Sequence, residues 1–198
     1  MTERVTGLRS MHDLGLAAWF GGSLMGAVGL NGAAVAEGGT WRDTARIASA
    51  GWAKWTPVNA AAIAVHLVGS SGMLASNAAR VATQQGVAAS TLAKTVLTGA
   101  ALAATAYSRV LGKKIELAAS DSPEDAEKAA KHPIDTDKAQ RQLACMQWAV
   151  PALTGGLLIL NALHGEQQRP AEQAHGMWQR ARSMAPVMPP MPHWHGMH

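Results

Sequence analysis

Charged residues divide the chain into long uncharged stretches separated by shorter charged segments. Uncharged stretches of 23, 25 and 24 residues occupy positions 14–36, 55–79 and 142–165. Each is long enough, at about 1.5 Å per residue, to cross a hydrocarbon core of about 30 Å as an α-helix. A helix on the surface of a soluble protein needs a polar stripe with charges, which these stretches lack. The pattern therefore predicts three membrane-spanning helices.

A fourth stretch, residues 95–108, is uncharged but shorter, and Lys94 and Arg109 flank it. Both long side chains can extend to the membrane interface, so residues 90–111 are predicted to form a fourth span. We therefore expect an all-α fold, a four-helix transmembrane bundle with up-down topology. Its spans lie at about 13–36, 57–79, 90–111 and 141–165. They form a domain of residues 1–166, followed by a polar and then Pro-, Met- and His-rich tail of residues 167–198.

The first connection is rich in tryptophan and basic residues. Trp41, Trp52 and Trp55 lie there among arginines and a lysine, and indole rings favour the headgroup level of a membrane. This mixture predicts a short amphipathic interfacial helix over residues 42–55. Pro57 follows Thr56, a good N-cap, and is therefore expected in the first turn of a separate second span.

The third connection is long and charged. Its sequence Ser122-Pro123-Glu124-Asp125 is a good helix start, and His132-Pro133 is expected to end that helix. The fourth long helix is then expected to begin near Thr136.

Composition limits the classes of protein that remain. The mean hydropathy is +0.01, charged residues make up 15% and aromatic residues 5%, and there is one cysteine. A charge content this low excludes a disordered chain, and a single cysteine excludes a disulfide scaffold. The net charge of +4 is spread over the connections and gives no groove for nucleic acid. Lys and Arg are more numerous in the first and third connections, which places both termini outside a plasma membrane.

Small residues recur at helical spacing inside the predicted spans. Gly22 with Gly26, and Gly99 with Ala103, form pairs four residues apart, a spacing that lets helix backbones approach closely. Two interpretations stay open: packing within the bundle, or docking against helices of another protein. Asn31 and Asn59 are expected on the same side of the membrane, where they could bond to each other.

Ionisable residues within the spans are the first candidates for chemistry. Neutral histidine can bind haem iron or copper, which makes His12, His66 and His164 candidate cofactor ligands. His66 is predicted mid-span, whereas His12 and His164 lie near the ends of their helices. The resulting difference in depth, on the order of 10 Å, argues against a bis-histidine haem. His12 and His164 could instead pair with each other on one face.

The tail carries a second group of candidate ligands. Its thioether and imidazole side chains suit copper, especially Cu(I), and the candidate ligands are Met188, Met191, His193, His195 and His198. The alternative is a tail that holds these residues without binding metal. Cys145 has no second thiol and is expected to be a small buried apolar residue. No phosphate loop, zinc-protease pattern or nucleophile elbow is present, so no catalysis is expected.

Two resemblances add to these inferences. The sequence from His12 through Trp19 to Gly21 and Gly22 resembles the first-helix pattern of copper-resistance-D-type membrane proteins. This resemblance implies a metal or haem role for His12 and structural roles for Trp19 and the glycines. The segments 55–59 and 106–109 are similar in style to small actinobacterial membrane proteins. One of those is a subunit associated with the cytochrome bcc–oxidase respiratory supercomplex.

Two functions follow as hypotheses. The first is a non-catalytic accessory protein that packs against other subunits of a larger, respiratory membrane complex and carries no cofactor. The second is a membrane protein that handles haem b or copper through the membrane histidines and the tail.

Overall fold

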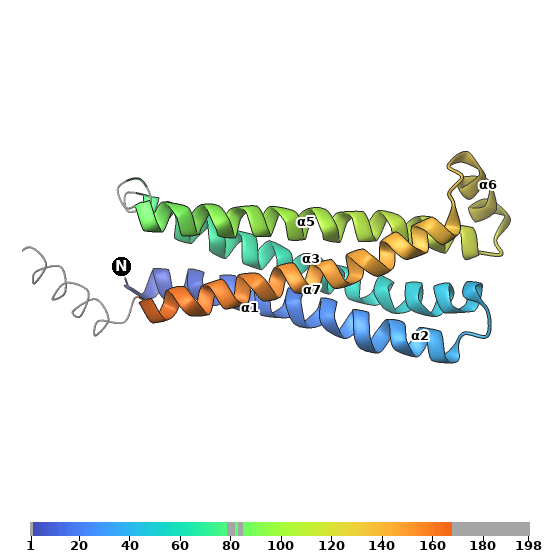
Figure 1. Ribbon diagram of the computed structural model, residues 1–198, viewed down its shortest axis with the longest axis horizontal. Helices are drawn as coiled ribbons and strands as arrows, with labels where there is room; N and C mark the ends of the chain where they lie inside the picture. Colours follow the sequence, from blue (N-terminus) through green and yellow to red (C-terminus); the bar gives the residue numbers. More distant parts are fainter. Residues whose placement is uncertain (1, 79–81, 83–84, 168–198) are drawn as a thin grey trace, which may run out of the picture. The chain divides into compact units, whose positions relative to one another are not determined.

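The computed structural model describes residues 2–78, 82 and 85–167, and this part of the chain is helical without strands (Figure 1). Its elements, in order, are α1 (Thr2–Met25), the π-helical turn η1 (Gly26–Leu30), α2 (Asn31–Glu37), α3 (Trp41–Ser76), α5 (Gln85–Ala119), α6 (Pro123–Lys131) and α7 (Thr136–Gln167). The chain divides into two units, Met1–Leu160 and Asn161–His198. The first unit contains α1 to α6 and most of α7, and residues 161–167 of the second are the last residues of α7.

Three helical segments are long and apolar enough to cross a membrane: Thr6–Glu37, Trp41–Ser76 and Thr136–Leu163. Helix α5 is also long, at 35 residues, but lies outside this set. Lys94 and several threonines make its middle part less apolar than the other three helices. The prediction of an all-α fold is confirmed for the described residues, and three of the four predicted spans lie in helices long and apolar enough to cross a membrane.

The helix that contains the second span is longer than predicted, and the prediction of a separate interfacial helix over residues 42–55 is wrong. Residues 41–76 form one continuous helix, α3, with Pro57 in its interior. Proline lacks the N–H that would bond the carbonyl four residues before it. Pro57 therefore leaves Ala53 O without its usual backbone donor, and the helix continues through this position. The prediction that Pro57 lies in the first turn of a separate helix is therefore wrong, because Pro57 lies inside α3.

Helix starts follow local capping chemistry. Thr40 precedes α3, and its hydroxyl oxygen accepts from the Asp43 N–H at 3.2 Å. Ser122 is the N-cap of α6, with Pro123 in its first turn, and His132 ends that helix, as the sequence predicts. Asp135 precedes α7 and accepts from the Lys138 N–H at 2.9 Å.

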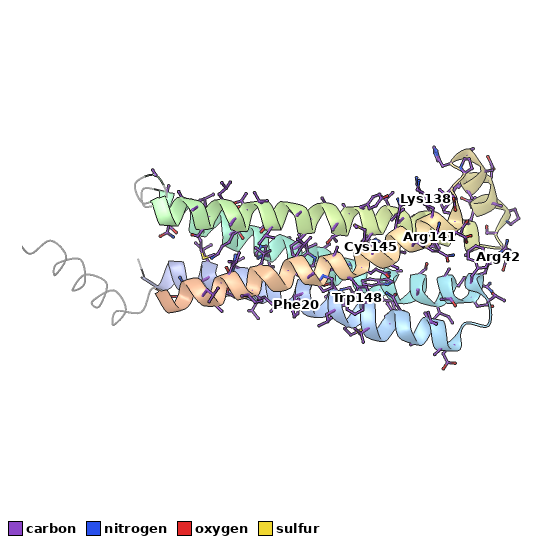
Figure 2. All side chains as sticks on the ribbon, viewed as in Figure 1. Phe20, Arg42, Lys138, Arg141, Cys145 and Trp148 are labelled. Atoms are coloured by element: carbon purple, nitrogen blue, oxygen red, sulfur yellow. The ribbon has the colours of Figure 1, made fainter. Side chains whose placement is uncertain are left out.

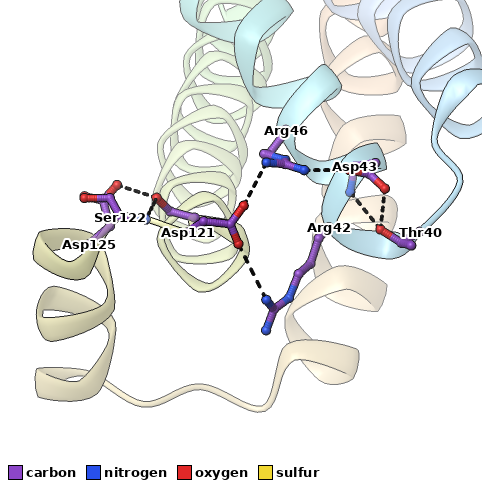
Figure 3. Close-up of polar contacts among 8 residues, drawn as sticks. Thr40, Arg42, Asp43, Arg46, Asp121, Ser122 and Asp125 are labelled. Carbon is purple, nitrogen blue, oxygen red and sulfur yellow. Dashed lines mark hydrogen bonds and ion pairs between the residues drawn. The ribbon is translucent and has the colours of Figure 1, made fainter.

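Ion pairs tie the start of α3 to the segment between α5 and α6 (Figure 3). Asp121 accepts from Arg46 at 3.0 Å and lies 3.8 Å from Arg42, while Arg46 also bonds Asp43 at 2.7 Å. Within α6, the Glu124 carboxylate bonds Lys128 at 2.6 Å and raises the pKa of the Lys128 ammonium. These groups are exposed, so each pair contributes little stability and the contribution falls with salt.

The interior is small and joins three helices. Its main cluster combines Leu16 and Trp19 of α1, Ala101 and Ala104 of α5, and Val150 and Leu157 of α7. A second cluster, nearer α6, consists of Leu111, Ile115 and Ala139. Trp19 is fully buried, and its indole N–H donates to Thr105 Oγ1 at 3.3 Å, which links α1 to α5.

Large apolar side chains also cover the outside of the helices. Leu14, Val68 and Ile159 are 69%, 54% and 63% exposed. Figure 2 shows the basic side chains of Arg42, Lys138 and Arg141 at the α6 end, with Trp148 farther along α7. Cys145 is exposed, so the prediction that it is buried is wrong (Figure 2). A small thiol on an outward apolar face needs no interior site, because such a face suits a lipid environment.

Candidate functional site

The structure brings two of the predicted histidines together. The ring centres of His12, on α1, and His66, on α3, lie 4.4 Å apart, with the ring planes inclined by 42°. The prediction that His12 and His66 lie at different depths in the membrane is therefore wrong. Helix α1 begins at Thr2 and α3 ends at Ser76, so each histidine lies ten residues inside its helix. The predicted spans, 13–36 and 57–79, place His12 just before the first span and His66 well inside the second, which makes the two depths differ.

Both histidines are buried and hydrogen-bonded. His66 is 1% exposed; its Nδ1–H donates to the backbone oxygen of His12 at 3.1 Å. That bond leaves Nε2 as an acceptor, and Ser70 Oγ lies 3.5 Å from it. His12 is 8% exposed, and its Nδ1 bonds the Asp13 carboxylate at 2.8 Å. The fully buried ring of Trp19 lies 6.1 Å from the His66 ring and closes this cluster.

Two glycines permit this approach, and the sequence reasoning missed both. A Cβ atom at Gly15 would lie 2.5 Å from Ala62 O and from His66 N, and one at Gly69 would lie 2.6 Å from Leu8 O. Each glycine therefore places its own backbone against the backbone of the other helix. Gly15 and His12 are three residues apart on α1, as are His66 and Gly69 on α3, which could have indicated a shared helix face.

The arrangement does not fit a haem held between His12 and His66. Two imidazoles that ligate one iron point a nitrogen of each ring at a common atom from opposite sides. Here the ring centres lie 4.4 Å apart, so the two rings contact each other directly and leave no room for an iron atom between them. Across the described residues, no group of three or more His, Cys, Asp or Glu side chains could hold a metal ion.

The other predicted ligands are not located by the structure. His164 lies in α7, but its side chain is outside the described part. The tail candidates Met188, Met191, His193, His195 and His198 lie outside the described residues altogether. Copper binding by the tail therefore stays a prediction.

The predicted packing glycines fall into two groups. Gly22 and Gly26 face the rings of Trp55 and Trp52 on α3, so this pair packs within the chain. The indole N–H of Trp52 also donates to Asn31 Oδ1 at 3.0 Å, so the predicted bond between Asn31 and Asn59 is wrong. Because α1 and α3 are antiparallel, Asn31 lies near the start of α3 rather than beside Asn59.

Gly99 and Ala103, unlike Gly22 and Gly26, do not pack against another helix in the described part of this chain. Both are exposed on α5, and a Cβ at Gly99 would meet no atom within 4 Å. They belong to an outward row with alternating spacings of four and three residues. We call this row the α5 seam; it consists of Leu92, Val96, Gly99, Ala103, Ala106 and Val110, all exposed. Such spacing is typical of a helix face that packs against another helix.

Comparison with protein-family models, with curated proteins and with solved structures finds no match for this chain.

Proposed function

We propose that this chain is a membrane accessory protein of four transmembrane helices in an up-down arrangement, and that it packs against another subunit through the α5 seam. The proposal includes no catalysis by the chain itself. By the second resemblance described above, the partner is part of a respiratory complex. Both termini lie outside the plasma membrane in this proposal, as the distribution of Lys and Arg favours.

The α5 seam carries the proposal. Helix α5 is the long helix outside the set of apolar spans, and the middle of its outward face holds Gly99, Ala103 and Ala106 between the larger side chains of the seam. Small residues on a helix face bring little apolar area to lipid, but they allow a second helix to approach the backbone. A protein partner therefore suits this face better than acyl chains do.

The proposal is tested by site-specific photocrosslinking in the native membrane. A benzophenone amino acid is placed at Ala103 on the seam and, as a matched control, at Ala64, which is exposed on α3. We expect a discrete adduct with one larger subunit from position 103 and none from position 64. Equal adducts from both positions, or adducts with lipid alone, would contradict a partner on the seam.

A second experiment places a larger side chain on the α5 seam instead of a crosslinker. Ala103→Leu should abolish co-migration with a larger complex on native electrophoresis, whereas Ala64→Leu should leave it unchanged. Both variants should keep wild-type thermal stability in detergent, because both positions face outward. A Soret band or stoichiometric copper in the isolated chain, without any partner, would instead support haem or copper handling.

A further inference from the structure

The outward side of α7 begins with two basic residues and continues as an apolar row. Lys138 and Arg141 are exposed and lie three residues apart near the start of the helix. Cys145, Trp148 and Ile159 follow at spacings that keep them on the same side, and all three are exposed. Figure 2 shows the first four of these residues in this order along α7. We call this surface of five residues the α7 face.

The α7 face points away from the interior of the protein. Ala139, which lies between the two basic residues in the sequence, is buried and packs against Leu111 and Ile115 of α5. Arg141 is two residues farther along the helix and therefore lies on nearly the opposite side from Ala139. The five side chains of the α7 face are consequently available to lipid.

The two basic residues lie where α7 enters the apolar part of the membrane. The span on this helix is Thr136–Leu163, and residues 142–165 carry no charge. Lys138 and Arg141 are therefore at the headgroup end of the span, and Trp148 lies about 10 Å deeper. Long basic side chains reach the headgroup level from such positions, where lipid phosphates are found.

These two cations have no acidic partner in the described part of the chain, because no ion pair or side-chain hydrogen bond involves Lys138 or Arg141. The Lys138 backbone N–H alone bonds Asp135. Asp137 lies beside them in the first turn of α7, where the positive end of the helix stabilises a carboxylate. By contrast, five other basic residues at this end of the molecule are paired with carboxylates: Arg42, Arg46, Lys113, Lys128 and Lys131.

Two cations at this spacing match the oxygens of one phosphate. Side chains three residues apart on a helix are neighbours, so both can reach the same group. The guanidinium of Arg141 presents a planar fork to two phosphate oxygens, and the ammonium of Lys138 adds a point charge. In phosphatidylcholine the choline cation balances the phosphate, whereas phosphatidylglycerol keeps a net negative charge. The pair therefore favours a lipid whose headgroup is anionic.

We propose that the α7 face is a binding site for an anionic phospholipid. The lipid phosphate lies between the Lys138 ammonium and the Arg141 guanidinium, and one acyl chain follows the row formed by Cys145, Trp148 and Ile159. This site is separate from the α5 seam, which belongs to another helix.

The test uses Cys145 as a reporter, because it is the only cysteine in the sequence. The dye bimane is attached to Cys145 in the full chain, which is placed in nanodiscs of dioleoylphosphatidylcholine. Phosphatidylglycerol or phosphatidylcholine with the same nitroxide-labelled acyl chain is added at increasing mole fraction, since a nearby nitroxide quenches bimane. We expect half-maximal quenching by the labelled phosphatidylglycerol at a mole fraction at least about fivefold lower, because each basic residue at the membrane surface favours an anionic lipid.

Two double variants separate this site from the general attraction of a positive chain. Lys138→Gln with Arg141→Gln removes the proposed phosphate ligands and should reduce the preference to below about twofold. Lys128→Gln with Lys131→Gln is the matched control, because it removes the same charge from α6 and should leave the preference unchanged. All four side chains are exposed, so both double variants should keep the thermal midpoint of the wild type.

A second position for the dye tests where the lipid binds. Val28→Cys in a Cys145→Ser chain moves the dye to another exposed position. Val28 lies nine residues from the end of the segment Thr6–Glu37, as Cys145 lies nine residues from the start of α7. The two labelled lipids should quench the dye at Val28 at mole fractions within about twofold of each other, because no basic residue ends that segment.

Two kinds of result would overturn the proposal. Equal quenching by the two lipids at Cys145 would mean that the α7 face contacts lipid without selecting a headgroup. An equal loss of preference in both double variants, or an equal preference at Val28 and Cys145, would mean that the net charge of this end attracts anionic lipid without a binding site.

Discussion

Helix α3 is packed in two different ways along its two inner faces. Toward α1, glycines bring the two backbones together, and a side chain as small as methyl at Gly15 would lie 2.5 Å from the α3 backbone. Toward α5 and α7, the same helix borders a cavity of about 230 Å³ with mostly apolar walls. Within a membrane, where burial of apolar surface contributes little, close packing holds helices together. The α1 side is therefore suited to holding the fold, whereas the side toward α5 and α7 is loosely packed.

The largest expected effect comes from adding a methyl group to the close side. Gly15→Ala should destabilise the chain by about 2 kcal/mol, because the new Cβ meets backbone atoms that cannot move independently of α3. The thermal midpoint in detergent should fall by about 5 °C, as followed by tryptophan fluorescence. Gly69→Ala should behave in the same way, since its Cβ would meet the α1 backbone.

The matched control for both variants is Gly21→Ala, on the same helix as Gly15. A Cβ at Gly21 would meet no atom within 4 Å, so this change should be neutral or slightly stabilising. Equal midpoints for Gly15→Ala and Gly21→Ala would show that α1 and α3 are not in backbone contact.

Next in size is the loss of the histidine contact on the same face. His66→Leu removes the bond from Nδ1 to His12 O and the ring contact with His12, and should cost about 1 kcal/mol. Val65→Leu, a neighbouring position that is 36% exposed, serves as the control. A variant as stable as the control would mean that the histidine pair serves another purpose than holding the two helices.

The sequence could predict much of this fold, because charge-free stretches and capping residues are local signals. The starts of α6 and α7 follow from Ser122, Pro123 and Thr136 in this way. The continuity of α3 could not be predicted, because proline is common in the first turn of a helix and is also tolerated inside an apolar helix.

The candidate site was harder to predict, because it depends on the register between helices. Whether His66 meets His12, and whether Asn31 meets Trp52 or Asn59, depends on where α1 and α3 begin and end. An error of a few residues at a helix end moves a side chain by about 1.5 Å per residue along the axis. The contact of the Trp55 ring with Gly22 depends on the same register between α1 and α3.

A smaller effect is expected where the two faces meet. Gly22→Ala places its Cβ against the ring of Trp55, and that ring also borders the cavity. The ring can move into the open space, so the loss should be below about 1 kcal/mol, less than for Gly15→Ala. The same movement should displace the indole N–H resonance of Trp55 in ¹⁵N-labelled protein. A loss as large as that of Gly15→Ala would mean that the Trp55 ring is held as firmly as the backbone.

The smallest expected effect comes from filling the loose side. Ala48→Val adds two methyl groups at a half-buried cavity position and should change stability by less than about 1 kcal/mol, toward a more stable protein. The added atoms gain dispersion contacts across space that is open in the unliganded chain. Ala50→Val, exposed on the same helix, controls for the lower helix propensity of valine. If Ala48→Val destabilised the chain as much as Gly15→Ala, the cavity side would be as closely packed as the α1 side, and the difference between the two faces of α3 would not exist in the folded protein.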